Sequence, residues 1–179
     1  MVNVMPEKKL VLVTGGARSG KSSFAMKLAR KCRGKVVFLA TAEPGDEEMR
    51  TRIERHKKER PETWETIEEP LAIAAGVEGL TNDFSALLFD CFTLFVANMI
   101  GADRSDADIA RETGAFLAAA HRLTATVIMV TNELGMGIVP ENAAARRFRD
   151  IHGRVNQLAA AAADEVYLMV SGVATKVKG

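Results

Sequence analysis

Five short apolar runs recur along the chain, and stretches with helical periodicity separate most of them. The runs are rich in Val, Leu and Ile and cover Leu10–Val13, Val36–Ala40, Ala86–Phe89, Thr126–Val130 and Val166–Val170. Runs of this kind, each followed by small or polar residues, are typical of central strands buried on both faces. The pattern predicts an α/β fold with a mostly parallel sheet, whose carboxyl ends carry the chemistry.

Helical periodicity and cap residues predict the elements between these runs. The expected helices cover Ser22–Cys32, Glu47–Arg60, Asp106–Leu123 and Ala143–Ala163. Asn142 marks the start of the last of them. The segment Ala174–Lys178 follows Ser171 and Gly172 closely. Because only a tight turn fits in that space, we expect an antiparallel strand at the edge of the sheet.

The length and composition indicate one globular domain. The chain has 179 residues, of which 47% are hydrophobic and 26% charged, and this is enough for a single domain with a sizeable core. We expect residues 10–179 to form that domain. Residues 1–9 carry no motif, and we expect this N-terminal extension to be partly disordered.

The overall charge excludes some classes of partner. Lys and Arg number 24 against 23 Asp and Glu, so the net charge of +1 gives no general attraction to nucleic acid or to an anionic membrane. The aromatic content of 6% leaves little for the stacking surfaces of single-strand-binding proteins. Any anion must therefore be bound at a local site, and we expect no nucleic-acid partner.

Cysteine usage and hydropathy predict a cytoplasmic protein without a membrane span. Cys32 and Cys91 lie far apart with no CxxC pair, which argues against a disulfide framework or a structural zinc site. The longest apolar stretch, Leu87–Ile100, is interrupted by Asp90 and Asn98 and is shorter than the roughly 18 residues that a span requires. The first apolar run is also too short for a signal peptide.

The most specific local motif lies between the first predicted strand and the first predicted helix. It matches G-x-x-x-x-G-K-[ST], the P-loop pattern, in the residues Gly15, Gly16, Ala17, Arg18, Ser19, Gly20, Lys21 and Ser22. Its backbone N–H groups would surround a polyphosphate, Lys21 would reach the terminal phosphates, and the Ser22 hydroxyl would ligate Mg²⁺. A glycine-rich turn of purely structural role would not need Lys and Ser at these two positions.

Asp90 is the candidate for a second magnesium-linked residue. It follows the run Ala86–Phe89 directly, and P-loop enzymes commonly take a carboxylate for Mg²⁺ from the tip of another strand. The alternative is that Asp90 caps the helix that begins near Phe92. Because a P-loop that binds a nucleotide with Mg²⁺ commonly needs such a carboxylate, the magnesium-linked interpretation of Asp90 is favoured.

The second predicted helix is strongly basic and carries a histidine on a half-buried stripe. Met49, Ile53, His56 and Arg60 are spaced by four, three and four residues, so they share one helical face. The pattern alone allows His56 to be either a packed histidine or a chemical group. The charged residues around it could equally form a solvated face.

A third cluster follows another strand tip and would lie at the same edge of the sheet as the P-loop. It runs from Val130 to Asn142 and includes Asn132, Glu133, two glycines and Pro140. The spacing alone fits either a functional loop or a glycine-containing turn followed by a helix cap.

Taken together, these motifs resemble the bifunctional adenosylcobinamide kinase/adenosylcobinamide-phosphate guanylyltransferases of cobalamin biosynthesis. The resemblance extends from about Leu10 to Lys178. It is carried by Thr14–Ser22, Ala40-Thr41-Ala42, Arg52-Ile53-x-x-His56 with Arg60-Pro61 and Trp64, the loop from Asn132-Glu133 to Pro140, Phe148-Arg149-Asp150, Gly153–Gln157 and Ala162–Val166.

The resemblance implies a RecA-like P-loop fold assembled as a homotrimer, with two successive reactions on one corrinoid substrate. In the first, ATP or GTP phosphorylates the aminopropanol hydroxyl of adenosylcobinamide. In the second, GTP transfers GMP to that phosphate and releases pyrophosphate. Two alternatives stay open: a guanylyltransferase that has lost the kinase step, and a non-catalytic RecA-like nucleotide-binding module.

The resemblance also implies roles for individual residues. In this family GMP passes through a covalent bond to a histidine, and the matching position is His56. Arg55 precedes it where some relatives have a second histidine, so the motif contains no spare nucleophile; His121 and His152 are interpreted as structural. The residues implied to contact the guanine nucleotide or to line its pocket are Thr41, Ala42, Glu43, Lys57, Lys58, Glu59, Arg60 and Glu68, with Asp90 near the magnesium.

Overall fold

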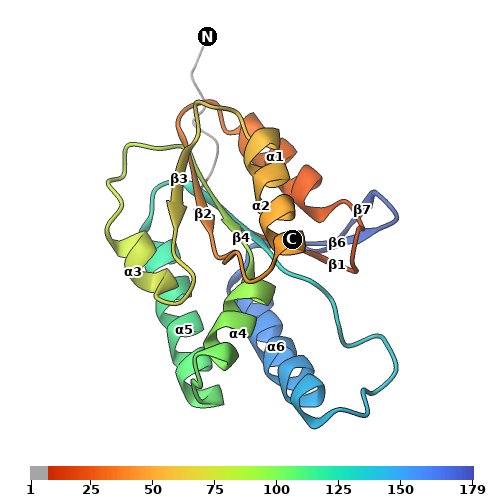
Figure 1. Ribbon diagram of the computed structural model, residues 1–179. Coiled ribbons are helices and arrows are strands. Elements are labelled where there is room, and N and C mark those ends of the chain that lie inside the picture. The colour runs from red at the N-terminus through yellow and green to blue at the C-terminus, as the bar shows by residue number, and fades with distance from the viewer. Residues whose placement is uncertain (1–7) are drawn as a thin grey trace.

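Seven strands form one sheet in the order β3-β2-β4-β5-β1-β6-β7 in the computed structural model, which describes residues 8–179 (Figure 1). Their bounds are β1 Leu10–Gly15, β2 Val36–Ala40, β3 Glu65–Glu68, β4 Ala86–Asp90, β5 Thr126–Val130, β6 Glu165–Val170 and β7 Val173–Lys178. All neighbouring pairs are parallel except β6 and β7. Partial disorder is expected for residues 1–9, of which residues 1–7 lie outside the described residues; Lys9 is placed directly before β1, where its carbonyl oxygen accepts from the Val127 N–H at 2.8 Å.

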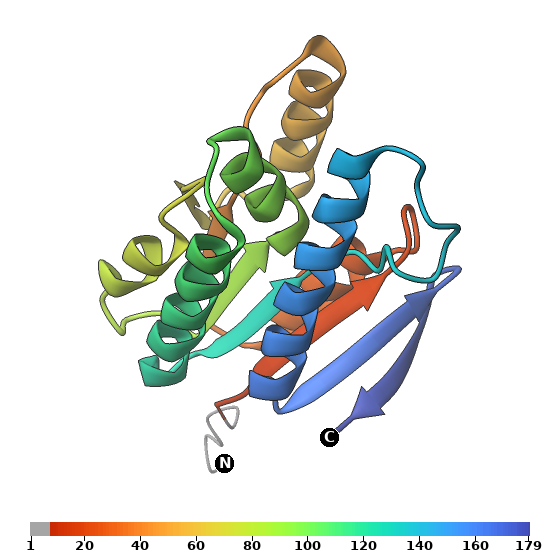
Figure 2. The ribbon, with the colours of Figure 1, turned by 90° about the horizontal axis from the view of Figure 1, so that it is seen from below.

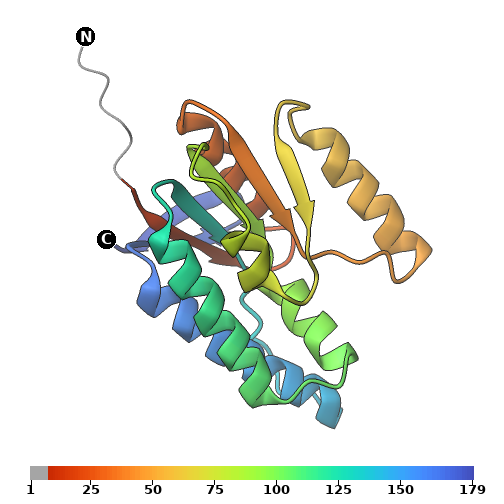
Figure 3. The same cartoon turned by 90° about the vertical axis from the view of Figure 1, so that its left-hand side faces the viewer.

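Six helices connect the strands and cover both faces of the sheet. They are α1 Lys21–Lys31, α2 Glu47–Glu59, α3 Ile73–Glu78, α4 Phe92–Gly101, α5 Asp106–Arg122 and α6 Ala143–Ala162. Figure 2 shows α3, α4, α5 and α6 on one face, with α1 behind the sheet. The remaining helix, α2, projects from the body of the molecule beside β3 (Figure 3). None of these helices is long and apolar enough to cross a membrane.

The side-chain alternation of the strands builds two apolar cores. In β4, Leu87 and Phe89 pack into the core under α3–α6, whereas Leu88 packs into the core under α1. The same division holds for Met129 and Val130 of β5. Because successive strand residues point to opposite faces, a strand buried on both sides must be apolar at every position. This explains the continuous apolar runs in the sequence.

The predicted fold class is confirmed, and most predicted elements agree with the structure within one or two residues. The expected antiparallel edge strand is β7, which pairs with β6. The expected start of the last helix is also confirmed, because the Asn142 side chain accepts a hydrogen bond from the Ala145 N–H at 3.1 Å. Two short elements, β3 and α3, were not predicted from the sequence.

Candidate functional site

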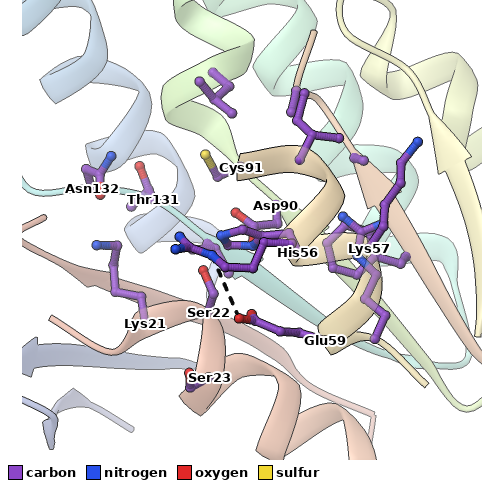
Figure 4. A pocket seen from close by; sticks show the side chains of 18 of the residues that line it. Lys21, Ser22, Ser23, His56, Lys57, Glu59, Asp90, Cys91, Thr131 and Asn132 are labelled. Carbon is purple, nitrogen blue, oxygen red and sulfur yellow. Dashed lines mark ion pairs between the residues drawn. The ribbon is translucent and has the colours of Figure 1, made fainter. Parts of the chain in front are cut away.

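A cavity of about 420 Å³ lies at the carboxyl ends of the strands, between the start of α1 and the inner face of α2 (Figure 4). Its walls come from the P-loop, α2, and the ends of β2, β4 and β5. Carboxyl ends of parallel strands are the usual place for ligands in α/β sheets. The predicted site residues that line it are Ala17, Arg18, Ser19, Gly20, Lys21, Ser22, Ala42, His56, Lys57, Glu59, Arg60, Glu68 and Asp90.

The P-loop has the backbone conformation that its glycines permit. Gly20, the N-cap of α1, has a φ of 92°, and Gly15 has a φ of 151°. A Cβ atom on Gly15 would lie 2.4 Å from the Met169 carbonyl oxygen, so a larger residue does not fit. The loop therefore leads directly into α1, whose first N–H groups and helix dipole favour an anion at this wall of the cavity.

Lys21 begins α1 and is held against the backbone of its own loop. Its side chain is nearly buried, with 8% of the residue exposed. The ammonium donates hydrogen bonds to the Gly16 carbonyl oxygen at 2.6 Å and to Ser19 Oγ at 3.4 Å. The cation is thus fixed within the loop that would surround the phosphates of a nucleotide.

Ser22 and Asp90 bring a hydroxyl and a carboxylate to the same cavity. Asp90 is the last residue of β4, and the N-cap of α4 is Cys91 rather than Asp90. The capping role considered for Asp90 is therefore wrong. No group of three or more His, Cys, Asp or Glu residues suited to a metal occurs within residues 8–179. One carboxylate and one hydroxyl fit Mg²⁺, which usually retains waters and takes further ligands from phosphate oxygens.

The stripe predicted on α2 faces the cavity. Asp46 caps this helix by accepting a hydrogen bond from the Met49 N–H at 2.7 Å. Met49, Ile53, His56 and Arg60 are all half-buried and line the cavity. Figure 4 shows the imidazole of His56 among the side chains that surround the space above Ser22. The histidine is therefore placed where a nucleotide phosphate could reach it.

Arg60 is half-buried, and two of its nitrogen atoms are buried without hydrogen-bond partners among the described residues. Its guanidinium carbon lies 3.5 Å from the centroid of the Phe38 ring, and Nε and Nη1 form no hydrogen bond within the described part of the chain. Burial lowers the pKa of Arg60, while the carboxylates of Asp90 and Glu68 partly oppose this. Buried donors without partners are costly, so this arrangement favours an anionic ligand in the cavity. Phe38 was missed because it lies in an unbroken apolar run.

Two ion pairs join residues at the rim. Lys57 Nζ lies 2.5 Å from Glu68 Oε1 and so connects α2 with β3. Arg55 and Glu59 form a weaker pair along α2, 4.0 Å between Nε and Oε1, which is dashed in Figure 4. All four side chains are about half exposed or more, so they contribute little to stability and are free to rearrange around a ligand.

Five of the predicted nucleotide-site residues do not line the cavity: Gly15, Gly16, Thr41, Glu43 and Lys58. The two glycines shape the loop. The expectation for Thr41 is corrected, because its fully buried hydroxyl donates to the Cys91 carbonyl oxygen and accepts from the Cys91 N–H, both at 2.9 Å. Thr41 thus ties the end of β2 to the end of β4. Glu43 and Lys58 are exposed.

The loop after β5 leaves the sheet beside the P-loop, as predicted. The Glu133 N–H donates to the Gly15 carbonyl oxygen at 2.9 Å, and Val130, Thr131 and Asn132 line the cavity. The sequence analysis singled out this segment by its motif but did not assign these residues to the nucleotide site.

Comparison with known proteins agrees with this geometry. Residues 11–177 match the family model described as cobinamide kinase/cobinamide phosphate guanyltransferase. The chain is 43% identical to the bifunctional adenosylcobalamin biosynthesis protein CobU of Escherichia coli K12 and 44% identical to that of Salmonella typhimurium LT2; each comparison covers 94% of this chain and 99% of the relative. It is 39% identical to the CobP protein of Pseudomonas aeruginosa, over 94% of this chain and 96% of the relative.

A solved structure shows the same fold at low sequence identity. A KaiC-like protein from Pyrococcus horikoshii OT3 matches with a TM-score of 0.54 and 16% identity, over 92% of this chain and 72% of the other. The fold and the near full-length sequence matches lead to one assignment. This chain belongs to the cobinamide kinase/cobinamide phosphate guanyltransferase family.

Proposed function

We propose that this chain phosphorylates adenosylcobinamide with ATP or GTP and then transfers GMP from GTP to adenosylcobinamide phosphate, giving adenosylcobinamide-GDP and pyrophosphate. The main support is that a P-loop and His56, on separate elements, line one cavity. A phosphate site alone would suit any nucleotide-binding module. A histidine opposite that site supplies the nucleophile that a guanylyl transfer through the protein needs.

In the kinase step, the substrate hydroxyl attacks the γ-phosphorus of the nucleotide. A new O–P bond forms, the bond to the β-phosphate oxygen breaks, and the hydroxyl proton is released. The N–H groups at the start of α1 and the ammonium of Lys21 would stabilise the charge on the phosphate oxygens. Because both lie on rigid elements, they require little reorganisation during the reaction.

In the guanylyl-transfer step, a neutral ring nitrogen of His56 attacks the α-phosphorus of GTP. The bond between the α-phosphorus and the bridging oxygen breaks, and pyrophosphate leaves. A phosphate oxygen of adenosylcobinamide phosphate then attacks the same phosphorus, the N–P bond breaks, and His56 is regenerated. Arg60, which also lines the cavity, would stabilise the charge that develops on the phosphate oxygens.

Ser22 and Asp90 would hold Mg²⁺ at this site. When bound, the ion supplies neutralisation of phosphate charge. The two residues contribute a hydroxyl and a carboxylate from the start of α1 and the end of β4. Lys57, Glu59 and Glu68 at the rim would contact the guanine nucleotide, and Ala42 would lie against it.

The assembly is proposed to be a homotrimer in the cytoplasm, as the family resemblance implies. Several apolar side chains of the β6–β7 hairpin are exposed, namely Val170, Val173 and Val177. Contact between subunits would cover such a surface. Both cysteines are buried and free, which suits a reducing compartment. A light-scattering mass near that of the monomer would contradict the trimer.

Intact-protein mass spectrometry after incubation with GTP and Mg²⁺ tests the central step. The wild-type chain should gain the mass of one GMP, and the adduct should be labile to acid and stable to base, as expected for a phosphoramidate. His56→Ala should show no gain while still binding GTP. His121→Ala, which changes an exposed histidine on α5, serves as the control and should gain GMP normally.

Product analysis with the corrinoid distinguishes the remaining alternatives. Adenosylcobinamide and ATP should yield the phosphorylated corrinoid. A GMP adduct without any corrinoid phosphorylation would indicate a guanylyltransferase that has lost the kinase step. Nucleotide binding with neither adduct nor phosphorylated product would indicate a non-catalytic module.

A further inference from the structure

Asn132 lies beside the P-loop at the end of β5. The hydrogen-bond ladder between β5 and β1 continues past the strand, because the Thr131 N–H donates to the Val13 carbonyl oxygen at 3.0 Å and the Glu133 N–H to that of Gly15 at 2.9 Å. Asn132 is therefore held next to the residues that lead into the phosphate-binding loop.

The pleat of this extended segment sends Thr131 and Asn132 to opposite sides of the sheet. Met129 belongs to the core under α3–α6, and Val130 to the core under α1. Continuing this alternation places the Thr131 side chain toward α6 and the Asn132 side chain toward α1 and the P-loop. Figure 4 shows Asn132 on the same side of the cavity as Lys21.

A closed ring of hydrogen bonds lies behind Asn132. His152 of α6 is 1% exposed, and its Nε2 lies 3.1 Å from both Thr93 Oγ1 and Thr131 Oγ1. The Thr131 hydroxyl donates to Asn156 Oδ1 at 2.7 Å. Asn156 Nδ2 donates to the Asn132 carbonyl oxygen at 2.9 Å, and the Asn132 N–H donates to Thr93 Oγ1 at 2.9 Å.

One tautomer of His152 satisfies the Thr131 contact. Because the Thr131 hydroxyl proton is used toward Asn156, its oxygen can accept only from a protonated Nε2 of His152, whereas in the other tautomer Nε2 accepts from the Thr93 hydroxyl. Burial lowers the pKa of His152 to about 4, against the influence of the Glu133 carboxylate. The imidazole is thus neutral near physiological pH, which preserves the closed ring of hydrogen bonds.

The ring occupies both backbone polar groups of Asn132 and leaves its side chain for the cavity. No hydrogen bond engages the Asn132 carboxamide anywhere in residues 8–179. A buried ring that joins α4, α6 and the segment after β5 at one backbone position fixes the direction in which the Asn132 side chain leaves the backbone. A carboxamide N–H that leaves the backbone beside a P-loop is a suitable donor to a phosphate oxygen.

We propose that Asn132 contacts the terminal phosphate of a nucleoside triphosphate bound at the P-loop, and that His152 is the positioning residue that orients it. The inference rests on the proposed function only in requiring a triphosphate at this loop. It adds a γ-phosphate contact from the segment after β5 to the contacts proposed for the P-loop and α2.

The test compares the affinities for GTP and GDP, each with Mg²⁺, by calorimetry in a His56→Ala background, where no covalent GMP forms. The parent should bind GTP more tightly than GDP. Asn132→Ala should weaken GTP binding about tenfold and leave GDP binding within about twofold, because only GTP carries the contacted phosphate. A parent without preference for GTP, or an unchanged preference in Asn132→Ala, would overturn the proposal.

Two substitutions at His152 test the positioning role. His152→Leu removes the Nε2 donor and should lose GTP preference as Asn132→Ala does, whereas His152→Gln can place an N–H near the same point and should retain most of it. Equal losses of GTP and GDP affinity in His152→Leu would indicate a merely structural role and overturn the assignment. The affinity ratio needs no corrinoid, so a failure to phosphorylate adenosylcobinamide would count against the proposed function alone.

Discussion

The guanidinium of Arg60 stacks over the ring of Phe38, with 3.5 Å between Cζ and the ring centroid. Phe38 belongs to the core under α1, so the ring is a rigid support. The Phe38 ring packs against one face of the guanidinium. Nε and Nη1 of Arg60 form no hydrogen bonds among the described residues. The planar group is therefore held in one orientation at the wall of the cavity.

This relationship predicts that Arg60→Lys is not a conservative change. Lysine carries the charge but lacks the planar fork and the stacking, so GTP affinity should fall about tenfold. In Arg60→Ala, which loses both the charge and the stacking, GTP affinity should fall further than in Arg60→Lys. Arg30→Ala, which removes an exposed cation from the far end of α1, is the matched control. Calorimetric titration with GTP measures all three, and equal affinity in Arg60→Lys and the wild type would contradict the role of the fork.

Lys21→Ala should impair both reactions. Its ammonium is fixed to the loop through the Gly16 carbonyl oxygen, and we propose that the same P-loop binds the nucleoside triphosphate that each of the two reactions consumes. We expect GTP affinity to fall at least about tenfold, with slower GMP adduct formation and slower corrinoid phosphorylation. Lys27→Ala on the exposed side of α1 should change neither rate. Loss of only one activity would indicate two separate nucleotide sites.

Glu68→Gln should reduce the preference for guanine. A carboxylate at the cavity rim can accept hydrogen bonds from guanine N1 and N2, and ITP lacks the N2 amino group. We expect the ratio of GTP to ITP affinity to fall by about tenfold. Glu65→Gln is a close control, because Glu65 lies on the same strand and is also ion-paired at the surface, with Lys35 at 2.9 Å.

Stability separates this role of Glu68 from a structural one. Its ion pair with Lys57 is exposed, at 58% and 50% of the two side chains. Breaking it should therefore change the free energy of unfolding by less than about 1 kcal/mol. A larger loss in urea denaturation, with unchanged GTP preference, would make Glu68 a structural residue.

The sequence predicts those parts of the fold that depend on local pattern. The central strands are buried on both faces, so their apolar runs are distinct, and Asn142 was recognisable as a helix cap. By contrast, β3 reads Glu-Thr-Ile-Glu at the sheet edge, and only Ile67 packs against the core. Its strand conformation comes from pairing with β2. Such tertiary pairing leaves no periodic signal in four residues.

In the candidate site, too, local patterns could be predicted from the sequence, whereas contacts between residues distant in the chain could not. The P-loop and the stripe on α2 are local patterns, and both were placed correctly at the cavity. The support of Arg60 by Phe38 and the bonding of Thr41 to Cys91 join residues far apart in the chain. His152 also illustrates the difference. Its burial fits the expected structural role, but it is connected to Asn132 through Thr131 and Asn156 on one side and through Thr93 on the other, and these connections exist only in the folded chain.

His152 should make stability depend on pH in acid. Burial lowers its pKa from the ordinary value of 6.5 to about 4 in the folded protein. Between these values the unfolded chain binds a proton that the folded protein does not, so the free energy of unfolding should decrease as pH falls from 6.5 toward 4. The full effect of this one group is about 3 kcal/mol. Urea denaturation of wild type and His152→Gln across this range measures it: the wild type should lose more stability than the variant, whereas His121→Gln should follow the wild type. Parallel curves for wild type and His152→Gln would show that His152 takes up its proton without loss of the native packing.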